Sequence, residues 1–339
     1  MGARKKVGVV LFQLGGPDSP AAVRPFLYNL FCDPDIIPLG PLGGLLRKPL
    51  AWWIAACRSR IAGQHYAEIG GQSPIRQLTE RQATKLADAL RPHIDASVVV
   101  AMRYWHPLTA EAVEQLNRAA PEELVLLPLY PQYSLATTGS SLNEWSRRYK
   151  PARPPLPLHV VESFYNHPLY IEALVEKIAL SLSHFEQPER AHLVFSAHGL
   201  PVSLIERGDP YQRQVEATVR LVLERGAQSV ARWPADHTLC YQSKVGRRAW
   251  LEPSLTATIE ALAREGKRHL LVVPVAFVTE HIETLHEINI EARAEAGKLG
   301  IEQFEMMPAV GDSPRFIAAL ADMVLAALGA RSPAVARAI

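Results

Sequence analysis

The chain has 339 residues, and 36 lysines and arginines balance 34 aspartates and glutamates, so the formal net charge is +2. A charge this close to zero argues against a nucleic-acid-binding protein, which needs a concentrated positive surface. Apolar residues make up 48% of the chain, which excludes an intrinsically disordered protein. The three cysteines, Cys32, Cys57 and Cys240, form no Cys-x-x-Cys pair and are too few for a disulfide framework or a four-thiolate metal site.

The N-terminus superficially resembles a secretory signal, because basic residues precede an apolar run at 7–12. That run is short, and Gly15-Gly16-Pro17 follows it without a cleavage site, so we interpret it as a first buried strand. Nowhere does the sequence reach the roughly 18–20 consecutive apolar residues that a membrane-spanning helix needs.

Residues 39–54 form an unusually apolar segment that contains the adjacent Trp52 and Trp53, with Arg47, Lys48 and Arg58 in or beside it. Paired tryptophans flanked by bases are typical of a segment that dips into lipid headgroups. A buried helix followed by a loop explains the same residues, so the pattern leaves two interpretations open.

Short β-rich runs alternate with stretches of helical spacing along the chain. The first half predicts strands at 7–12, 97–102 and 123–129 and helices at 75–90 and 109–119. The second half predicts strands at 192–196, 238–243 and 269–275 and helices at 168–182, 212–224, 255–264, 282–298 and 315–328. This alternation favours parallel sheets covered by helices.

Prolines cluster between residues 151 and 157 and mark a break between two similar halves. We therefore predict an α/β protein of two similar doubly wound, Rossmann-like units with parallel sheets and a cleft between them. The predicted bounds are 1–155 and 156–330, with a disordered tail at 331–339. In such folds the ligand lies beyond the carboxyl ends of the strands.

His198 follows one of these strands, and Gly199 after it allows a tight bend. A histidine there can accept a proton near neutral pH or ligate a divalent metal, although a lone histidine is more often structural. Gly15-Gly16-Pro17, after the first strand, lacks the spacing of a phosphate-binding loop, so no nucleotide is predicted.

Glu283, Glu287 and Glu291 are spaced by four and would share one face of a helix. Like charges at this spacing cost about 0.2–0.5 kcal/mol per pair, so the row needs a reason. It is either a solvated face or a carboxylate path for cations or protons, with His281 at its head. The zincin motif His-Glu-x-x-His is absent, so a fixed structural zinc is not predicted.

Aromatic residues supply flat apolar surface near the predicted cleft, namely Tyr66, Tyr130, Tyr133, Trp250 and Phe277. Arg58 and Arg103 are suited to bidentate contacts with carboxylates. Core packing explains any one of these residues. Taken together, they fit a large, flat, apolar ligand that carries a few acid groups and can meet a metal.

Over about residues 6 to 328 the sequence resembles the ferrochelatases, the enzymes that insert Fe(II) into a porphyrin as the last step of the classical route to protohaem. The resemblance rests on motifs that agree in order, at residues 14–17, 69–75, 103–109, 130–134, 137–143, 195–201, 208–211, 242–246 and 281–285. It implies a chelatase-like fold and the activity of a metal chelatase, a lyase of haem biosynthesis.

The resemblance also implies roles for individual residues. His198 and Glu283 match the family's catalytic pair, and the residues expected to meet the metal are His198, His281, Glu283, Glu287 and Glu291, on a helix with a π-type distortion. The residues expected to bind the porphyrin are Leu14, Arg58, Tyr66, Ser73, Arg103, Tyr130, Trp250 and Phe277. Segment 39–60 matches the lip of the porphyrin pocket.

Residues 130–134 with 137–141 are similar to the protoporphyrin-using branch of the family, so protoporphyrin IX and ferrous iron are the expected substrates. Several members bind a [2Fe–2S] cluster through cysteines. Here Leu135 occupies one such position and the C-terminus has no cysteine, so we expect no cluster and no tightly bound cofactor. Gly199 stands where serine is common, and we expect little effect. The resemblance implies a cytoplasmic enzyme that contacts the inner face of the membrane peripherally.

Two other functions fit parts of the pattern. A cobalt chelatase for sirohydrochlorin would need more basic pocket residues, because that substrate carries far more carboxylates. A porphyrin or haem carrier would bind porphyrin tightly without turnover, and the pair His198 and Glu283 argues against it.

Overall fold

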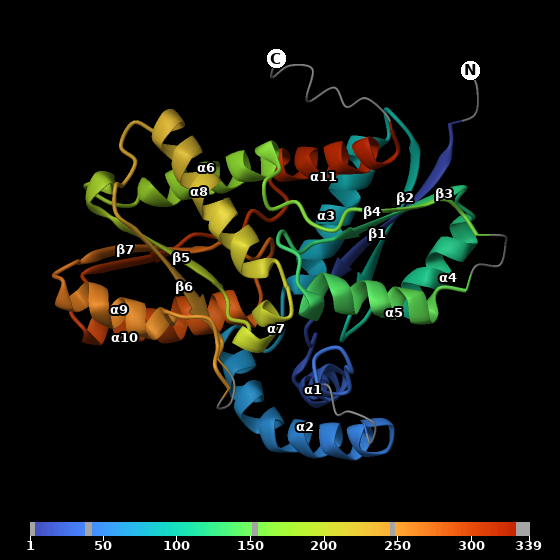
Figure 1. Cartoon of the computed structure of the whole chain (residues 1–339), viewed down its shortest axis with the longest axis horizontal. Coiled ribbons are helices and arrows are strands. Elements are labelled where there is room, and N and C mark those ends of the chain that lie inside the picture. Colours follow the sequence, from blue (N-terminus) through green and yellow to red (C-terminus); the bar gives the residue numbers. More distant parts are fainter. Residues whose placement is uncertain (1–3, 38–42, 151–154, 245–247, 330–339) are drawn as a thin grey trace. The chain divides into compact units, whose positions relative to one another are not determined.

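A computed structural model gives the fold of the protein and describes residues 4–37, 43–150, 155–244 and 248–329 (Figure 1). The chain divides into two compact units, each built on a four-stranded sheet. One comprises the described residues up to Tyr130, Ser134–Ser163 and those from Phe316 onward; the other comprises Pro131–Tyr133 and Phe164–Arg315. Within the described ranges, no helix has the length and apolar character needed to cross a bilayer.

The first unit contains the parallel strands β1 (Lys6–Gln13), β2 (Asp95–Met102), β3 (Glu123–Pro128) and β4 (Leu158–Val160), in the order β2-β1-β3-β4. Every residue of β1 after Lys6 is buried. A continuous apolar run of this kind is expected of a central parallel strand whose two faces are both covered by helices.

The helices of the first unit are α1 (Val23–Phe31), α2 (Gly43–Glu68), α3 (Ile75–Leu90), α4 (Thr109–Ala119), α5 (Ser140–Arg148) and most of α11 (Pro314–Ala327). Two short helices precede α1 and α5, the 3-10 helix η1 (Pro20–Ala22) and the π-helix η3 (Leu135–Gly139). Helices α4 and α5 cover one face of the sheet, where Trp145 packs edge-on against Phe12 with ring centroids 5.9 Å apart.

The second unit repeats this topology with β5 (His192–His198), β6 (His237–Gln242), β7 (His269–Pro274) and β8 (Gln303–Met306), in the parallel order β6-β5-β7-β8. Its helices are α6 (Pro168–Leu182), α7 (Val202–Glu206), α8 (Tyr211–Ser229), α9 (Leu255–Arg264), α10 (Arg293–Lys298), the 3-10 helix η4 (Pro188–Arg190) and the π-helix η5 (Glu283–Ala292). In Figure 1, α6 and α8 lie on one side of the sheet and α9 and α10 on the other.

The predicted α/β class with two parallel sheets is confirmed, and helices α3, α4, α6 and α9 have the predicted bounds. The sequence missed β4 and β8, because both are short edge strands without an apolar run. It also missed α5, whose sequence Ser-Ser-Leu-Asn-Glu-Trp-Ser-Arg-Arg offers few buried side chains.

The exposure of helix α2 excludes one of the two interpretations of the apolar segment, and contact with lipid headgroups stays a prediction. Leu45, Trp52 and Trp53 are 80%, 58% and 60% exposed, so a buried helix is wrong for residues 43–54. An apolar surface of this size on a helix is typical of an interaction surface rather than of a core element. The part of the segment at 39–42 lies outside the described residues, as does the predicted tail at 331–339.

The sequence-derived domain bounds assign α11 to the second half, whereas its residues from Phe316 onward group with the first unit. Most of this helix is buried, including Phe316, Leu320 and Val324. A helix with so little polar surface is expected to be packed in a core rather than to end the chain on the surface.

Replacing Gly226 with alanine is expected to destabilise the protein by about 1–3 kcal/mol. A Cβ atom at this position in α8 would lie 2.3 Å from the ring of Trp233, which would have to move. Gly63, inside α2, has no atom within 4 Å of the corresponding point. The matched variant Gly63→Ala should therefore stabilise the helix by about 0.5–1 kcal/mol. Equilibrium unfolding of both variants measures these effects, and equal changes would contradict the packing around Trp233.

Candidate functional site

His198 and Glu283 form a direct contact in the second unit. His198 is the last residue of β5, Glu283 is the first residue of η5, and His198 Nδ1 lies 2.7 Å from Glu283 Oε2. The side chains are 35% and 16% exposed, so the pair is reachable from solvent but largely enclosed. With Nδ1 bonded to the carboxylate, Nε2 is the imidazole atom that can take a proton or bind a metal.

The contact changes the pKa of both groups. Burial lowers the pKa of His198, but the charge and hydrogen bond of Glu283 outweigh burial and raise it above its ordinary value. Burial raises the pKa of Glu283, but the charge and hydrogen bond of His198 outweigh it and lower the pKa to about 2. Near neutral pH Glu283 is therefore ionised and favours the protonated imidazole.

Ser243 links this pair to Glu287. Its Oγ donates a very short hydrogen bond to Glu287 Oε2 and lies 3.5 Å from Glu283 Oε2. Burial, followed by the negative charge of Glu283, raises the pKa of Glu287 to about 7. Glu287 is thus the carboxyl group of the row that can gain and lose a proton near neutral pH.

Ser243 is a site residue that the sequence analysis did not single out. It has a φ of +66°, in the left-handed region that is costly for a residue with a side chain. Its position directly after β6, at the sheet edge where β5 ends with His198, is the signal that identifies it. Residues 245 and 246 of the predicted 242–246 motif lie outside the described part of the chain.

His281 lies beside the same carboxylate. Its Nδ1 lies 3.2 Å from the carbonyl oxygen of Thr279, which fixes the ring with Nε2 directed to Glu283 Oε1 at 3.9 Å. The ring packs against Phe277 with centroids 4.5 Å apart. Two predicted metal residues and one predicted porphyrin residue are therefore neighbours here.

The acidic row runs from a buried to an exposed end. Glu283 is 16% exposed, whereas Glu291 is 54% exposed and lies 3.7 Å from His286 Nδ1. The three carboxylates lie on the π-helix η5, as the resemblance implied. Glu280 is different, because its carboxylate accepts hydrogen bonds from Thr284 Oγ1 at 2.5 Å and the Ala309 amide at 2.6 Å, which gives it a structural role.

Gly199 is enclosed by its neighbours. A Cβ atom there would lie 2.8 Å from the backbone oxygen of Gln242 and 3.3 Å from Cε3 of Trp250, a predicted porphyrin residue. The first distance is shorter than Cβ contacts in real proteins. A serine at 199 would therefore require this backbone to shift, and the expectation that glycine in place of serine has little effect stays a prediction.

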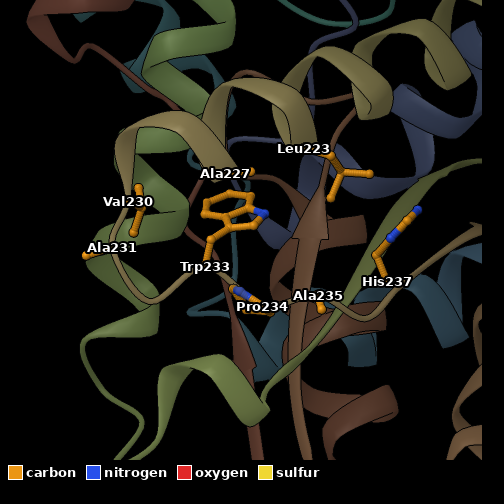
Figure 2. Close-up of a pocket in the computed structure, with 8 residues that line it drawn as sticks. All are labelled: Leu223, Ala227, Val230, Ala231, Trp233, Pro234, Ala235 and His237. Carbon is orange, nitrogen blue, oxygen red and sulfur yellow. The ribbon is translucent and has the colours of Figure 1, made fainter.

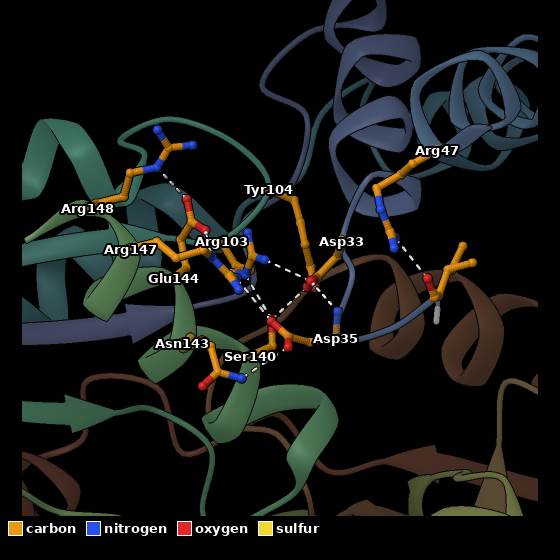
Figure 3. Close-up of polar contacts among 12 residues, drawn as sticks. Asp33, Asp35, Arg47, Arg103, Tyr104, Ser140, Asn143, Glu144, Arg147 and Arg148 are labelled. Atoms are coloured by element: carbon orange, nitrogen blue, oxygen red, sulfur yellow. Dashed lines mark hydrogen bonds and ion pairs between the residues drawn. The ribbon is translucent and has the colours of Figure 1, made fainter. Parts of the chain in front are cut away.

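The first unit has its own polar centre, around Asp33 (Figure 3). The buried carboxylate of Asp33 accepts hydrogen bonds from Tyr104 Oη and Ser140 Oγ, both at 2.6 Å, and from Arg103 Nη2 at 2.9 Å. Burial would raise the pKa of Asp33, but the hydrogen bonds from Ser140 and Tyr104 and the charge of Arg103 lower it. Asp33 is therefore a buried, ionised group.

The other predicted porphyrin residues of this unit occupy different settings. The amides of Arg103 and Tyr104 bind the carbonyls of Gln13 and Leu14 at 2.8 and 3.0 Å, so Leu14 adjoins Arg103 at the end of the sheet. Tyr130 Oη lies 3.4 Å from Ser141 Oγ. Tyr66 and Ser73 are buried, and Arg58 is exposed with its guanidinium 5.9 Å from the ring of Phe31.

A hollow of about 400 Å³ lies in the second unit, between the end of α8 and the start of β6 (Figure 2). The residues that line it are Leu223, Ala227, Val230, Ala231, Trp233, Pro234, Ala235 and His237. None of the predicted site residues is among them, and the lining offers a single titratable side chain. The hollow therefore does not mark the candidate site.

The family model and the relatives found by comparison with known proteins point to the same family. The ferrochelatase family model matches residues 6–328. Ferrochelatase of Thermosynechococcus vestitus is 47% identical over 329 residues, covering 96% of this chain and 83% of that protein. Ferrochelatase of Citrifermentans bemidjiense is 47% identical over 319 residues, covering 94% and 98%. The solved structure of SirB from Bacillus subtilis with Fe3+ shares the fold, with a TM-score of 0.53, 13% identity and 95% of each chain covered.

Replacing Glu283 with glutamine is expected to lower the pKa of His198, because the carboxylate charge that stabilises the imidazolium is removed. An NMR titration of the histidine ring signals measures this pKa. Glu291→Gln is the matched control and should leave it nearly unchanged, since Glu291 is exposed and does not contact His198. An unchanged pKa in Glu283→Gln would contradict the ion pair.

Proposed function

This chain belongs to the ferrochelatase family, and from that premise we propose that its porphyrin substrate is protoporphyrin IX. The enzyme inserts ferrous iron into a porphyrin in haem synthesis. Insertion exchanges the two pyrrole N–H protons of the macrocycle for Fe(II), so the site has to accept protons and deliver a cation. The contact between His198 and Glu283 is the observation that supports the assignment of this chemistry to named residues.

In the proposed mechanism, Nε2 of His198 takes a proton from a pyrrole nitrogen. The carboxylate of Glu283 stabilises the imidazolium that forms, since it is hydrogen-bonded to Nδ1 on the other side of the ring. The transfer starts from the neutral imidazole, and the raised pKa of His198 makes this ring a stronger proton acceptor. One nitrogen cannot hold a proton and iron at once, so the metal-binding role of His198 excludes its role as base in the same step.

Glu287 and Glu291 form the proposed outward path for protons. Glu287 shares Ser243 with Glu283 and has a pKa of about 7, which suits a group that is loaded and unloaded near neutral pH. Glu291 is exposed and can release the proton to water. In the reverse direction, these carboxylates and His281 are the proposed contacts of incoming Fe(II), a cation that accepts oxygen and nitrogen ligands.

The remaining predicted residues are the proposed porphyrin contacts: Leu14, Arg58, Tyr66, Ser73, Arg103, Tyr130, Trp250 and Phe277. Flat aromatic and apolar side chains suit the macrocycle, and arginine suits its propionates. The contact between the rings of Phe277 and His281 supports the assignment of Phe277, because it lies next to the metal residues.

We propose further that the enzyme has no [2Fe–2S] cluster and no other tightly bound cofactor. Burial raises the pKa of the Cys240 thiol to about 12, so the thiolate that a cluster needs is strongly disfavoured there. Cys32 is half-buried and Cys57 is exposed on α2. Three cysteines with such different settings do not form a ligand set.

We also propose that α2 binds the membrane peripherally, which would place the enzyme in the cytoplasm at the inner face of the membrane. The exposed side chains of Leu45, Leu46, Trp52 and Trp53 form the apolar part of this surface. The guanidinium of Arg24 lies 4.8 Å from the ring of Trp52, so a base accompanies the tryptophan as headgroup contact requires.

His198→Ala is expected to lower the rate of Fe(II) insertion by about 100-fold or more, because the variant lacks the proposed base. Protoporphyrin binding should persist, as measured by the change in porphyrin fluorescence. His237→Ala, an exposed histidine of the same unit, serves as the matched control with normal turnover. Near-normal insertion by His198→Ala would disprove the proposed mechanism, and preferred turnover of sirohydrochlorin over protoporphyrin would disprove the substrate.

The double variant Trp52→Ser/Trp53→Ser is expected to lose most of its binding to vesicles that contain anionic lipids, because both tryptophans are exposed. Co-flotation with the vesicles measures binding, and turnover of porphyrin in detergent reports whether the site is intact. Leu180→Ser changes an exposed apolar residue on α6 and is the control. Unchanged flotation of the double variant would rule out α2 as the docking surface.

A further inference from the structure

Asp33 occupies an unusual position for a carboxylate, because its side chain has no exposure to solvent. Four donors reach its two oxygens: Tyr104 Oη, Ser140 Oγ, Arg103 Nη2 and the backbone amide of Asp35 at 2.9 Å (Figure 3). A buried carboxylate is costly unless it is paired and hydrogen-bonded, and this one is fully bonded. The structure therefore holds a buried charge here whose oxygens are all engaged by donors.

Three segments of the first unit meet at this carboxylate. Asp33 follows α1, Arg103 and Tyr104 follow β2, and Ser140 is the first residue of α5. The segment after β2 is also bonded to the end of β1 through the carbonyls of Gln13 and Leu14. Asp33 thus lies at the carboxyl end of the sheet, where ligands bind in parallel α/β folds.

The guanidinium of Arg103 is held at two of its nitrogens. Nη2 donates to Asp33 at 2.9 Å and Nε donates to Ser140 Oγ at 2.8 Å, while Ser140 in turn donates to Asp33. Only 10% of the Arg103 side chain is exposed. A guanidinium fixed in this way has one orientation, and the charge of Asp33 neutralises its own.

Asp35, two residues further on, provides a contrast. Its carboxylate accepts hydrogen bonds from Asn143 Nδ2 and Arg147 Nη2, both at 3.0 Å, near the surface of α5. Asp35 thus bonds the segment after α1 to helix α5, but no hydrogen bond or ion pair joins it to Arg103. Substitution of Asp35 therefore tests the attachment of the segment after α1 to α5, whereas substitution of Asp33 tests the orientation of Arg103.

We propose that Asp33 is a positioning residue for porphyrin binding, which acts by holding Arg103 in the orientation that meets the substrate. The inference rests on the proposed role of Arg103 as a porphyrin contact. Because the Arg103 side chain is already oriented, it loses less conformational entropy when the porphyrin binds. The expected effect of Asp33 is therefore on the affinity for porphyrin and not on the rate of the chemical step.

The test measures KM for protoporphyrin, KM for Fe(II) and kcat in Asp33→Asn and Asp35→Asn. Asp33→Asn is expected to raise the porphyrin KM about tenfold, with kcat and the KM for Fe(II) within about twofold of the parent. Asp35→Asn should leave all three constants unchanged. A merely structural role would not separate the two substrates, so an equal effect on both KM values, or none, would overturn the proposal.

The Arg103→Met background shows whether Asp33 acts through the arginine. There, Asp33→Asn should add no further increase in porphyrin KM, and a full additional increase would overturn the proposal. If Arg103→Met alone leaves the porphyrin KM unchanged, the proposed porphyrin role of Arg103 is wrong and the inference falls with it. If Arg103→Met raises this KM and Asp33→Asn does not, the inference alone is wrong.

Tyr104→Phe provides a milder variant in case Asp33→Asn does not fold. Tyr104 is completely buried, so it cannot touch a ligand, and its hydroxyl is one of the donors to Asp33. The variant should raise the porphyrin KM by about threefold with an unchanged KM for Fe(II). A porphyrin KM equal to that of the parent enzyme would count against the proposal.

Discussion

The hydrogen-bonded contact between His198 and Glu283 is the constraint on which the arrangement of the second unit depends. An ionised carboxylate in a largely enclosed site is stable only if a partner compensates for its lost hydration. The fold provides this partner by ending β5 at His198 and starting η5 at Glu283. Ser243 and His281 then have their positions set around the same carboxylate, one from the end of β6 and one from the start of the helix.

The π-helix η5 carries the acidic row from this contact toward the surface. Each carboxylate of the row repels the next, and the raised pKa of Glu287 expresses that repulsion together with burial. His198 compensates the charge of Glu283 at the enclosed end of the row, while Glu291 at the other end is exposed to solvent. The row therefore holds one carboxyl group with a lowered pKa, Glu283, next to one with a raised pKa, Glu287. This difference in pKa suits the proton path proposed for the row, which a uniformly solvated acidic face would not provide.

How far the sequence predicts the fold depends on burial. Strands β1 and β5 are buried along most of their length, and their apolar runs identify them directly. The edge strand β4 is exposed at Leu158 and Val160, so its three residues carry no such pattern and its pairing with β3 alone defines it. For helix α2 the apolar residues are evident in the sequence, but their burial is not, because an exposed apolar face and a buried one have the same composition.

The site shows the same limit. His198 and Glu283 stand out because histidine after a strand and a row of glutamates are chemically unusual. Asp33 and Ser243 do not stand out, since their importance arises from partners far away in the chain: Ser140 for Asp33 and Glu287 for Ser243. Gly199 is a related case, because only the backbone oxygen of Gln242 shows that a side chain there has no room.

The two units share a strand order but differ in how they treat charge at equivalent positions. The segment after β2 carries Arg103, which Asp33 neutralises, and the segment after β6 carries Ser243, which serves two carboxylates. The first unit thus ends its sheet in a neutral, fixed cluster, which suits a large apolar ring with few acid groups. The second ends its sheet with a row of carboxylates beside His198 and His281, which suits the proposed delivery of a metal ion and removal of protons. The shared topology therefore supplies two sheet ends, and in the proposed mechanism the residues that follow the strands give each end a different part of the reaction.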